Sequence, residues 1–236
     1  MLEINTEKLD CKKDDVSRLK RLLTELGSER VWRPVFIEGK QVCRGQGFDE
    51  DGPQHALKHI DFNNKTVIDF GCNVGHYAFW AAGKGAQACF GVDVDADVIE
   101  AARLMAYVLG MQHVDFDVIN FLENPLPTQY DVGLLVDFIG KATIAKGRLP
   151  AVVRAVDQAV TKEAIVTVRP RYHLQDDLAR SEEEIADLQL APFVHDGWFD
   201  LVACLKAWMP GWHFDMATQS DRLNRKFKYS LYLTRI

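Results

Sequence analysis

From Lys65 onward, short apolar runs rich in β-forming residues alternate with longer runs whose apolar residues recur at helical spacing. The expected strands are KTVIDFG, ACFGVDV, HVDFDVI, YDVGLLVDF and EAIVTVRP. The expected helices include GHYAFWAAGKG, ADVIEAARLMAYVLG and RLPAVVRAVDQAV, and the first two finish at a glycine. Strands that alternate with helices of this length form a parallel sheet covered on both faces. The pattern therefore predicts an α/β fold with a Rossmann-like, doubly wound sheet.

The end of the chain departs from this alternation. HFDMATQ and KFKYSLYLTRI are two strand-like runs separated only by the polar segment SDRLNR. We expect them to pair as an antiparallel hairpin. The hairpin would complete a mostly parallel sheet of about seven strands, the five alternating strands and these two.

The beginning of the chain also departs from the alternation. Leucines and a valine at helical spacing predict a helix over Asp14–Leu26 that stops at Gly27. Two short strands are expected around the turn at Glu38–Lys40, followed by a short helix over Gln54–His59. We therefore expect residues 1–64 to form a small helix and strand extension, a cap or lid, ahead of a domain that covers residues 65–236.

Composition limits the class of protein. The chain has 236 residues, 47% of them hydrophobic, and no apolar run long enough to span a bilayer, so a globular protein is expected. Its N-terminus is polar and unlike a signal peptide. Its 5 cysteines show no CxxC pair, which favours a reduced, cytoplasmic protein without a metal site. The net charge of -6 counts against a general nucleic-acid binder, although it permits a local basic patch.

The segment DFGCNVG, Asp69 to Gly75, joins the first expected strand to a helix. Glycines there allow a tight turn at the carboxyl edge of the sheet, where a ligand can approach the backbone. The spacing differs from the dinucleotide fingerprint G-x-G-x-x-G. A carboxylate two places before Gly71 would also repel a pyrophosphate, whereas it suits an amino group and a sulfonium cation. An NAD-binding oxidoreductase is therefore disfavoured.

This segment resembles the first motif of the class I S-adenosylmethionine (SAM)-dependent methyltransferases, an acid followed by three alternating glycines. Asp69, Gly71 and Gly75 match that motif, and Asn73 replaces the middle glycine, a mild change because asparagine tolerates left-handed backbone angles. Cys72 lies inside the turn and is expected to be a small filler, not a nucleophile. The Gly-Cys-Asn-x-Gly variant resembles a subgroup that includes proteins similar to tRNA wobble-uridine carboxymethyltransferases.

The resemblance assigns further residues to a SAM site. Asp93 ends a strand about 20 residues past the turn, where a carboxylate meets the ribose hydroxyls, and Asp95 is expected to cap the next helix. Asn120 and Phe121 occupy the place where the family contacts adenine, although loop packing is an equal alternative. Asp137 ends the strand whose carboxyl end faces the methyl group in this family.

The acceptor side of the site has weaker signals. Arg169 and Arg171 leave the last parallel strand and could grip an anionic substrate, or they could be solvated. His173, His195 and His213 could each supply a general base, and none of them is favoured. The aromatic residues near the C-terminus could line a pocket but more often belong to a core: Trp198, Phe199, Trp208 and Trp212.

Three functions fit the resemblance. The first is methyl transfer from SAM to an unidentified acceptor, favoured as a small molecule, with S-adenosylhomocysteine as product. The second is modification of RNA, in particular tRNA, which the acidic net charge disfavours. The third is SAM binding without transferase activity. Relatives with the Gly-Cys-Asn motif often carry a Tyr-His pair where this chain reads Phe138-Ile139-Gly140-Lys141, which keeps the third open.

Overall fold

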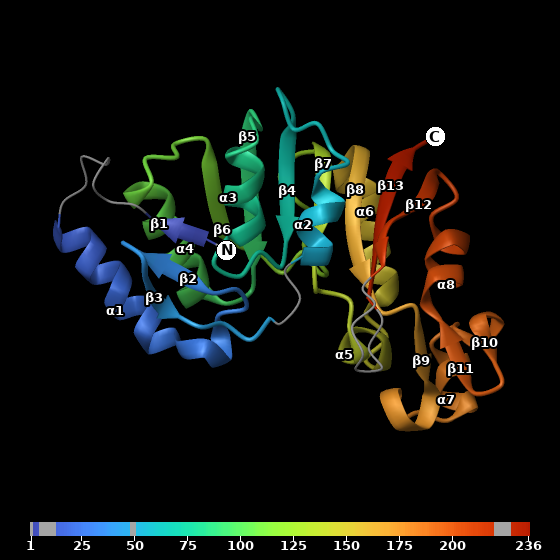
Figure 1. Cartoon of the computed structure of the whole chain (residues 1–236). Coiled ribbons are helices and arrows are strands. Elements are labelled where there is room, and N and C mark those ends of the chain that lie inside the picture. Colours follow the sequence, from blue (N-terminus) through green and yellow to red (C-terminus); the bar gives the residue numbers. More distant parts are fainter. Residues whose placement is uncertain (1, 5–12, 48–50, 220–227) are drawn as a thin grey trace. The chain divides into compact units, whose positions relative to one another are not determined.

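The computed structural model of the chain describes residues 2–4, 13–47, 51–219 and 228–236 (Figure 1). The chain divides into two compact units. The first comprises Met1–Glu50 and Asp61–Asn124, and the second comprises Asp51–Ile60 and Pro125–Ile236. Within the described ranges, no helix is both long enough and apolar enough to cross a membrane.

The main sheet has 7 strands in the order β12-β13-β8-β7-β4-β5-β6. Their bounds are β4 (Thr66–Phe70), β5 (Ala88–Asp93), β6 (Val114–Val118), β7 (Tyr130–Leu135), β8 (Val160–Val168), β12 (Trp212–Gln219) and β13 (Tyr229–Arg235). Strand β5 is parallel to β4 and β6, and β7 is parallel to β8, whereas β13 is antiparallel to β8 and β12. The predicted α/β sheet with a terminal antiparallel hairpin is confirmed.

In the first unit, helices accompany strands β4, β5 and β6. The elements are α1 (Lys13–Arg30), α3 (His76–Ala82), α4 (Ala96–Val108), β1 (Leu2–Ile4), β2 (Val35–Ile37) and β3 (Lys40–Cys43). Four of the five residues of β4 are buried, as expected for an apolar strand inside a parallel sheet. Asp95 precedes the first residue of α4, and its carboxylate accepts hydrogen bonds from the amides of Asp97 and Val98, so the predicted cap is confirmed.

The N-terminal elements follow the sequence pattern with two differences. Helical geometry in α1 breaks at Gly27, which has φ 65°, and then resumes briefly to Arg30. The expected strand pair is present as β2 and β3, which are antiparallel. Strand β1 pairs in parallel with β2 and was not predicted, because three residues are too few to show a period. Helix α1 packs beside α4 and β3 and buries its leucine face.

The second unit adds a small lobe between β8 and β12. Besides its strands of the main sheet, the second unit contains three helices that precede β8 in the chain, α2 (Asp51–Leu57), α5 (Lys141–Ala145) and α6 (Leu149–Ala159). The lobe itself consists of β9 (Arg171–His173), a π-helical turn η1 (Leu174–Leu178), α7 (Glu182–Asp187), η2 (Ala191–Phe193), β10 (Val194–His195), β11 (Trp198–Asp200) and α8 (Leu201–Trp208). Strands β10, β11 and β9 form a second antiparallel sheet. Phe199 and Trp212 are core residues, whereas Trp198 is 42% exposed.

Candidate functional site

The turn after β4 is held together by its own backbone. The amides of Gly71 and Cys72 both donate to the carbonyl oxygen of Val92 in β5, at 2.8 and 3.0 Å. The amide of Gly75 donates to the carbonyl oxygen of Cys72 at 2.8 Å. These N–H groups are therefore engaged within the protein and do not form an open cradle for phosphate oxygens. A ligand that brings its own hydrogen-bond donors suits this turn better, since carbonyl oxygens have two lone pairs each.

Asn73 takes the left-handed backbone that the middle position of the motif needs, with φ 51° between Gly71 at φ 68° and Gly75 at φ 84°. Its side chain does what a glycine could not. The amide oxygen accepts from Trp32 N at 2.9 Å, and the amide nitrogen donates to the carbonyl oxygen of Arg30 at 2.7 Å. Asn73 thus fastens the segment after α1 to the glycine turn. Sequence reasoning assigned Asn73 to the turn but missed this second task.

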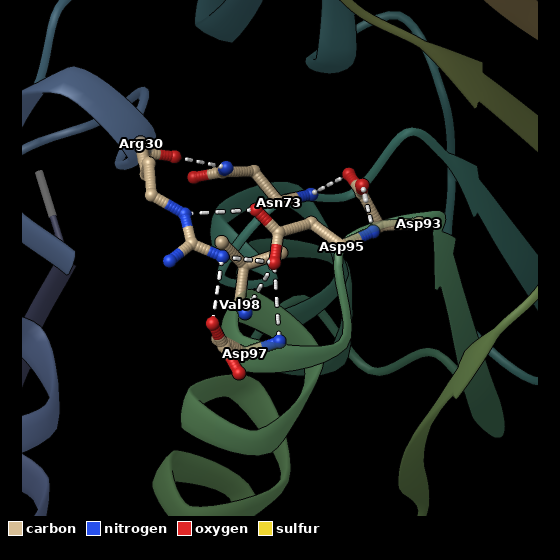
Figure 2. A network of polar contacts seen from close by, with 6 residues as sticks. All are labelled: Arg30, Asn73, Asp93, Asp95, Asp97 and Val98. Atoms are coloured by element: carbon tan, nitrogen blue, oxygen red, sulfur yellow. Dashed lines mark hydrogen bonds and ion pairs between the residues drawn. The ribbon is translucent and has the colours of Figure 1, made fainter.

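Asp93 lies at the end of β5 and already accepts two backbone hydrogen bonds (Figure 2). One carboxylate oxygen accepts from Asn73 N at 2.9 Å, and the other accepts from Asp95 N at 3.1 Å. These bonds fix the carboxylate against the glycine turn. An ionised carboxylate has about four acceptor positions, so about two are left for the hydroxyls of a ribose. The geometry fits the ribose role expected of Asp93, which stays a prediction.

Arg30 links the N-terminal segment to the beginning of α4, next to Asp93 (Figure 2). Its guanidinium bonds Asp95 at 2.5 and 3.0 Å and Asp97 at 2.9 Å. Partial burial alone would raise the pKa of Asp95, but the hydrogen bond from Arg30 and the capping amides hold it below its usual value. The Arg30 side chain is 43% exposed, so the ion pairs orient this corner more than they stabilise it.

Asp69 lies beneath the glycine turn and is 2% exposed. Its carboxylate accepts from the amide of Ala78, in the first turns of α3, at 3.2 Å. Burial raises the pKa of Asp69 to about 7, the negative charge of Asp93 adds to that rise, and the bond from Ala78 opposes it. The carboxyl group is therefore near its midpoint at neutral pH. A bound cation would favour the ionised form.

Phe116 in β6 was not singled out from the sequence, yet it explains two glycines. A side-chain carbon on Gly75 or on Gly91 would overlap its ring, and one on Gly91 would also lie 2.9 Å from the sulfur of Cys72. Cys72 is buried, and that burial raises the pKa of its thiol well above the usual value. The protonated thiol is suited to filling space, as expected. Tight packing under the turn is thus a second reason for Gly75, and a reason for Gly91 in the neighbouring strand.

The two residues expected at the adenine position are engaged locally. The side-chain oxygen of Asn120 accepts from Leu122 N at 3.3 Å, which closes its own turn. Phe121 is 6% exposed, and its ring meets that of Phe70 edge-on at 5.0 Å. Both lie in the first unit, directly after β6. Their contact with adenine stays a prediction.

Asp137 belongs to the second unit, in the loop after β7. It has a left-handed backbone at φ 58°, and its amide donates to the hydroxyl of Thr167 at 2.6 Å. Its carboxylate forms an ion pair with Lys228, and the Asp137 side chain is 4% exposed. A non-glycine residue held in this backbone conformation is a feature of functional loops. All the other residues predicted for the cofactor site lie in the first unit.

Both arginine candidates and two of the histidine candidates of the second unit have partners inside the protein. Arg169 forms two hydrogen bonds to Asp177, at 2.7 and 2.6 Å, and Arg171 bonds Asp200 at 3.3 Å. His173 accepts from the amide of Asp176 at 3.2 Å and so caps the π-helical turn η1. The other two candidates, His195 and His213, are exposed, and His213 bonds a neighbouring carboxylate. The basic segment RLNRKFK lies outside the described residues except for Lys228.

Comparison with known proteins identifies the family of this chain. A family model described as a methyltransferase domain matches residues 61–228, well over half of the chain. The chain belongs to this methyltransferase family. It therefore carries a SAM-dependent methyltransferase domain, and SAM is its cofactor.

Curated relatives share part of this domain. The ribosomal protein L11 methyltransferase of Shewanella halifaxensis is 30% identical over 145 residues, which are 61% of this chain and 43% of the relative. The enzyme of the same name from Vibrio campbellii is 37% identical over 83 residues, 35% of this chain and 26% of the relative. The chain thus spans less than half the length of these curated relatives.

Solved structures agree on the fold. The N-terminal domain of EvdMO1, crystallised in the presence of S-adenosylhomocysteine and D-fucose, has a TM-score of 0.60 at 14% identity and covers 94% of this chain and 97% of that one. The magnesium protoporphyrin IX methyltransferase of Synechocystis PCC 6803, with bound S-adenosylhomocysteine, has a TM-score of 0.53 at 15% identity and covers 81% of this chain and 90% of that one. At these identities the likeness establishes the fold.

Proposed function

We propose that this protein transfers the methyl group of SAM to a small-molecule acceptor and releases S-adenosylhomocysteine. The observation that carries the proposal is the engaged backbone of the glycine turn beside two carboxylates. Engaged amides and nearby negative charge disfavour a pyrophosphate and favour a ligand with an ammonium, a sulfonium and a ribose diol. The proposed cofactor-binding residues are Asp69, Gly71, Cys72, Asn73, Gly75, Asp93, Asn120, Phe121 and Asp137.

The chemistry asks little of the protein beyond positioning. The sulfonium of SAM makes its methyl group electrophilic already, so the cofactor supplies the reactive centre. Asp93 would hold the ribose, and Asp69 would favour the methionine ammonium, directly or through water. The remaining task is to hold a nucleophile in line with the methyl carbon and to exclude water. An acceptor that is already nucleophilic needs no general base, and we assign none.

We propose that the part of the N-terminal extension in the first unit, residues 1–50, is a cap over the cofactor turn, whereas α2 belongs to the second unit. The bonds from Asn73 to Trp32 and Arg30 support this, because they tie the extension to a cofactor-binding loop. The ion pairs of Arg30 with Asp95 and Asp97 support it at the next loop. A cap attached to both loops would respond to binding of the cofactor.

Calorimetric titration tests the cofactor site. Wild-type protein is expected to bind SAM and S-adenosylhomocysteine but not NADH. Asp93→Ala should weaken SAM binding roughly 30- to 150-fold, since it removes about 2 to 3 kcal/mol of charge-assisted hydrogen bonding. Asp117→Ala removes an exposed carboxylate of β6 and serves as the control, with unchanged affinity expected. Unchanged SAM affinity in Asp93→Ala would show that the ribose role is misassigned.

A protein acceptor is the second candidate, because the curated relatives named above are called ribosomal protein L11 methyltransferases. The relation to tRNA-modifying enzymes stays a prediction, and the net charge of -6 weighs against it. Incubation with methyl-labelled SAM and separate small-molecule, protein and tRNA pools distinguishes the three acceptors. Label in none of the pools, from protein that binds SAM, would favour the alternative of a SAM-binding protein without transferase activity.

A further inference from the structure

A buried histidine beside the glycine turn has no function in the mechanism above. His76 directly follows Gly75 as the first residue of α3 and is 5% exposed. Its Nδ1 has no hydrogen-bond partner among the described residues. Burial lowers the pKa of His76 to about 3, and the charge of Arg33 adds to the effect, so the ring is neutral at physiological pH. A buried polar atom without a partner is costly, and a bound ligand that supplies the partner is one explanation.

A buried cation lies beside this histidine. Arg33 is 2% exposed, and its guanidinium lies over the ring of Tyr77 at 5.6 Å from the centroid. Tyr77 follows His76 in α3, and the rings of these two residues meet edge-on at 4.9 Å. The residue before Arg33 donates its amide to Asn73 in the glycine turn. Arg33 and His76 are therefore gathered at the same end of α3 as the proposed methionine site.

The methionine part of SAM carries two opposite charges on one carbon atom, an ammonium and a carboxylate. Groups that bind these two charges must therefore lie next to each other. The carboxylate of Asp69, proposed for the ammonium, bonds the amide of Ala78, only two residues past His76. Arginine is well suited to bind a carboxylate, and a neutral imidazole protonated on Nδ1 can add one donor. The beginning of α3 thus contacts both a carboxylate, Asp69, through Ala78 and a guanidinium, Arg33, through Tyr77.

We propose that Arg33 and His76 bind the carboxylate of the methionine part of SAM. The inference rests on the proposed cofactor site and adds its anion-binding half, with Arg33 contributed by the N-terminal extension. The proposal predicts that affinity depends strongly on the carboxylate while Arg33 is present and much less once Arg33 is replaced. Decarboxylated SAM, which keeps the ammonium and the sulfonium, supplies the probe.

The test is a cycle of four calorimetric titrations, SAM and decarboxylated SAM against wild type and Arg33→Met. Removing the carboxylate is expected to weaken binding to the wild type roughly 10- to 100-fold. Arg33→Met should weaken SAM binding by a similar factor and leave decarboxylated SAM nearly unchanged. A structural role for Arg33 would weaken both ligands equally and would overturn the proposal. Equal affinities of the wild type for both ligands would also overturn it.

Two further variants keep the test decisive. His76→Phe preserves an aromatic ring and removes the nitrogen, and it should lower the preference for SAM over decarboxylated SAM. This variant carries the test if Arg33→Met fails to fold, and an unchanged preference would overturn the proposal. Arg21→Met changes the same charge on an exposed residue of α1 and should change neither affinity. Failure of the wild type to bind either ligand would instead refute the cofactor site itself.

Discussion

Two carboxylates, one in each unit, have little exposure to solvent but pKa values shifted in opposite directions. Asp69 in the first unit accepts a hydrogen bond from one backbone amide of the described residues, that of Ala78, and burial raises its pKa to about 7. Asp177 in the second unit is 12% exposed and receives two bonds from Arg169 and a third from Lys141. Burial would raise the pKa of Asp177 as well, but these cations hold it well below its usual value.

The difference separates a structural group from a binding group. A carboxylate that is fully supplied with donors fixes the elements around it, and Asp177 fixes η1 by also accepting from the amide of His173 at 2.9 Å. A buried carboxylate with few donors is costly to ionise, and a cationic ligand bound next to it stabilises the ionised form. Asp69 is of the second kind, and it lies under the turn where the ammonium of SAM is proposed.

The largest expected effect is a pH dependence of stability caused by Asp69. Because its folded pKa is raised above 3.8, its contribution to stability is complete below about pH 4 and is lost as pH rises through about 7. At 1.36 kcal/mol per pKa unit, the loss is about 4 kcal/mol at most. Asp69→Asn should remove this part of the pH dependence. Chemical denaturation of wild type and variant at pH 5 and pH 8 measures it.

Ligand binding gives an independent readout of the same carboxyl group. A cation bound beside Asp69 lowers its pKa, so SAM binding at pH 7 should release protons. Calorimetry in two buffers of different ionisation enthalpy detects that release, and Asp69→Asn should lose it. Identical proton release in both proteins would mean that Asp69 does not meet the ammonium, and the contrast with Asp177 would lose its functional meaning.

The next effect in size concerns the Asp177 network and has the opposite pH sign. Arg169→Met leaves a mostly buried carboxylate with fewer donors and should lower the free energy of unfolding by about 2 to 3 kcal/mol at pH 7. Because the pKa of Asp177 is depressed, this stabilisation is lost as pH falls below about 4. SAM affinity should not change. Urea denaturation at pH 7 and calorimetry measure the two quantities.

An exposed ion pair is the control for that prediction. Arg18 and Glu100 have side chains that are 58% and 50% exposed, and their pair should contribute no more than about 0.5 kcal/mol. Arg18→Met removes the same charge with little cost. If Arg169→Met lowered the free energy of unfolding by as little, Asp177 would behave like a partner in an exposed ion pair. The contrast drawn between Asp177 and Asp69 would then be wrong.

The sequence predicted the parts of this fold that depend on neighbours along the chain. The strand and helix periods, the break at Gly27 and the cap at Asp95 are local signals, and the structure has all of them. Pairings between distant residues were not predictable. Asn73 bonds a residue 41 positions away, and no period encodes the match of Asp177 with Arg169. The motif likewise predicted glycines for ligand access, whereas packing against Phe116 also requires one of them, Gly75.

The smallest effect tests whether a fully satisfied polar group in the first unit behaves like Asp177. Asn73→Gly keeps the left-handed backbone and removes the two side-chain bonds to the N-terminal segment. It should lower stability by about 1 to 2 kcal/mol and weaken SAM binding modestly, because the cap loosens. Asn64→Gly is the matched control: Asn64 is exposed with φ 57°, so its replacement should change stability by less than about 0.5 kcal/mol. Equal losses in the two variants would mean that the backbone, not the bond to the cap, accounts for Asn73.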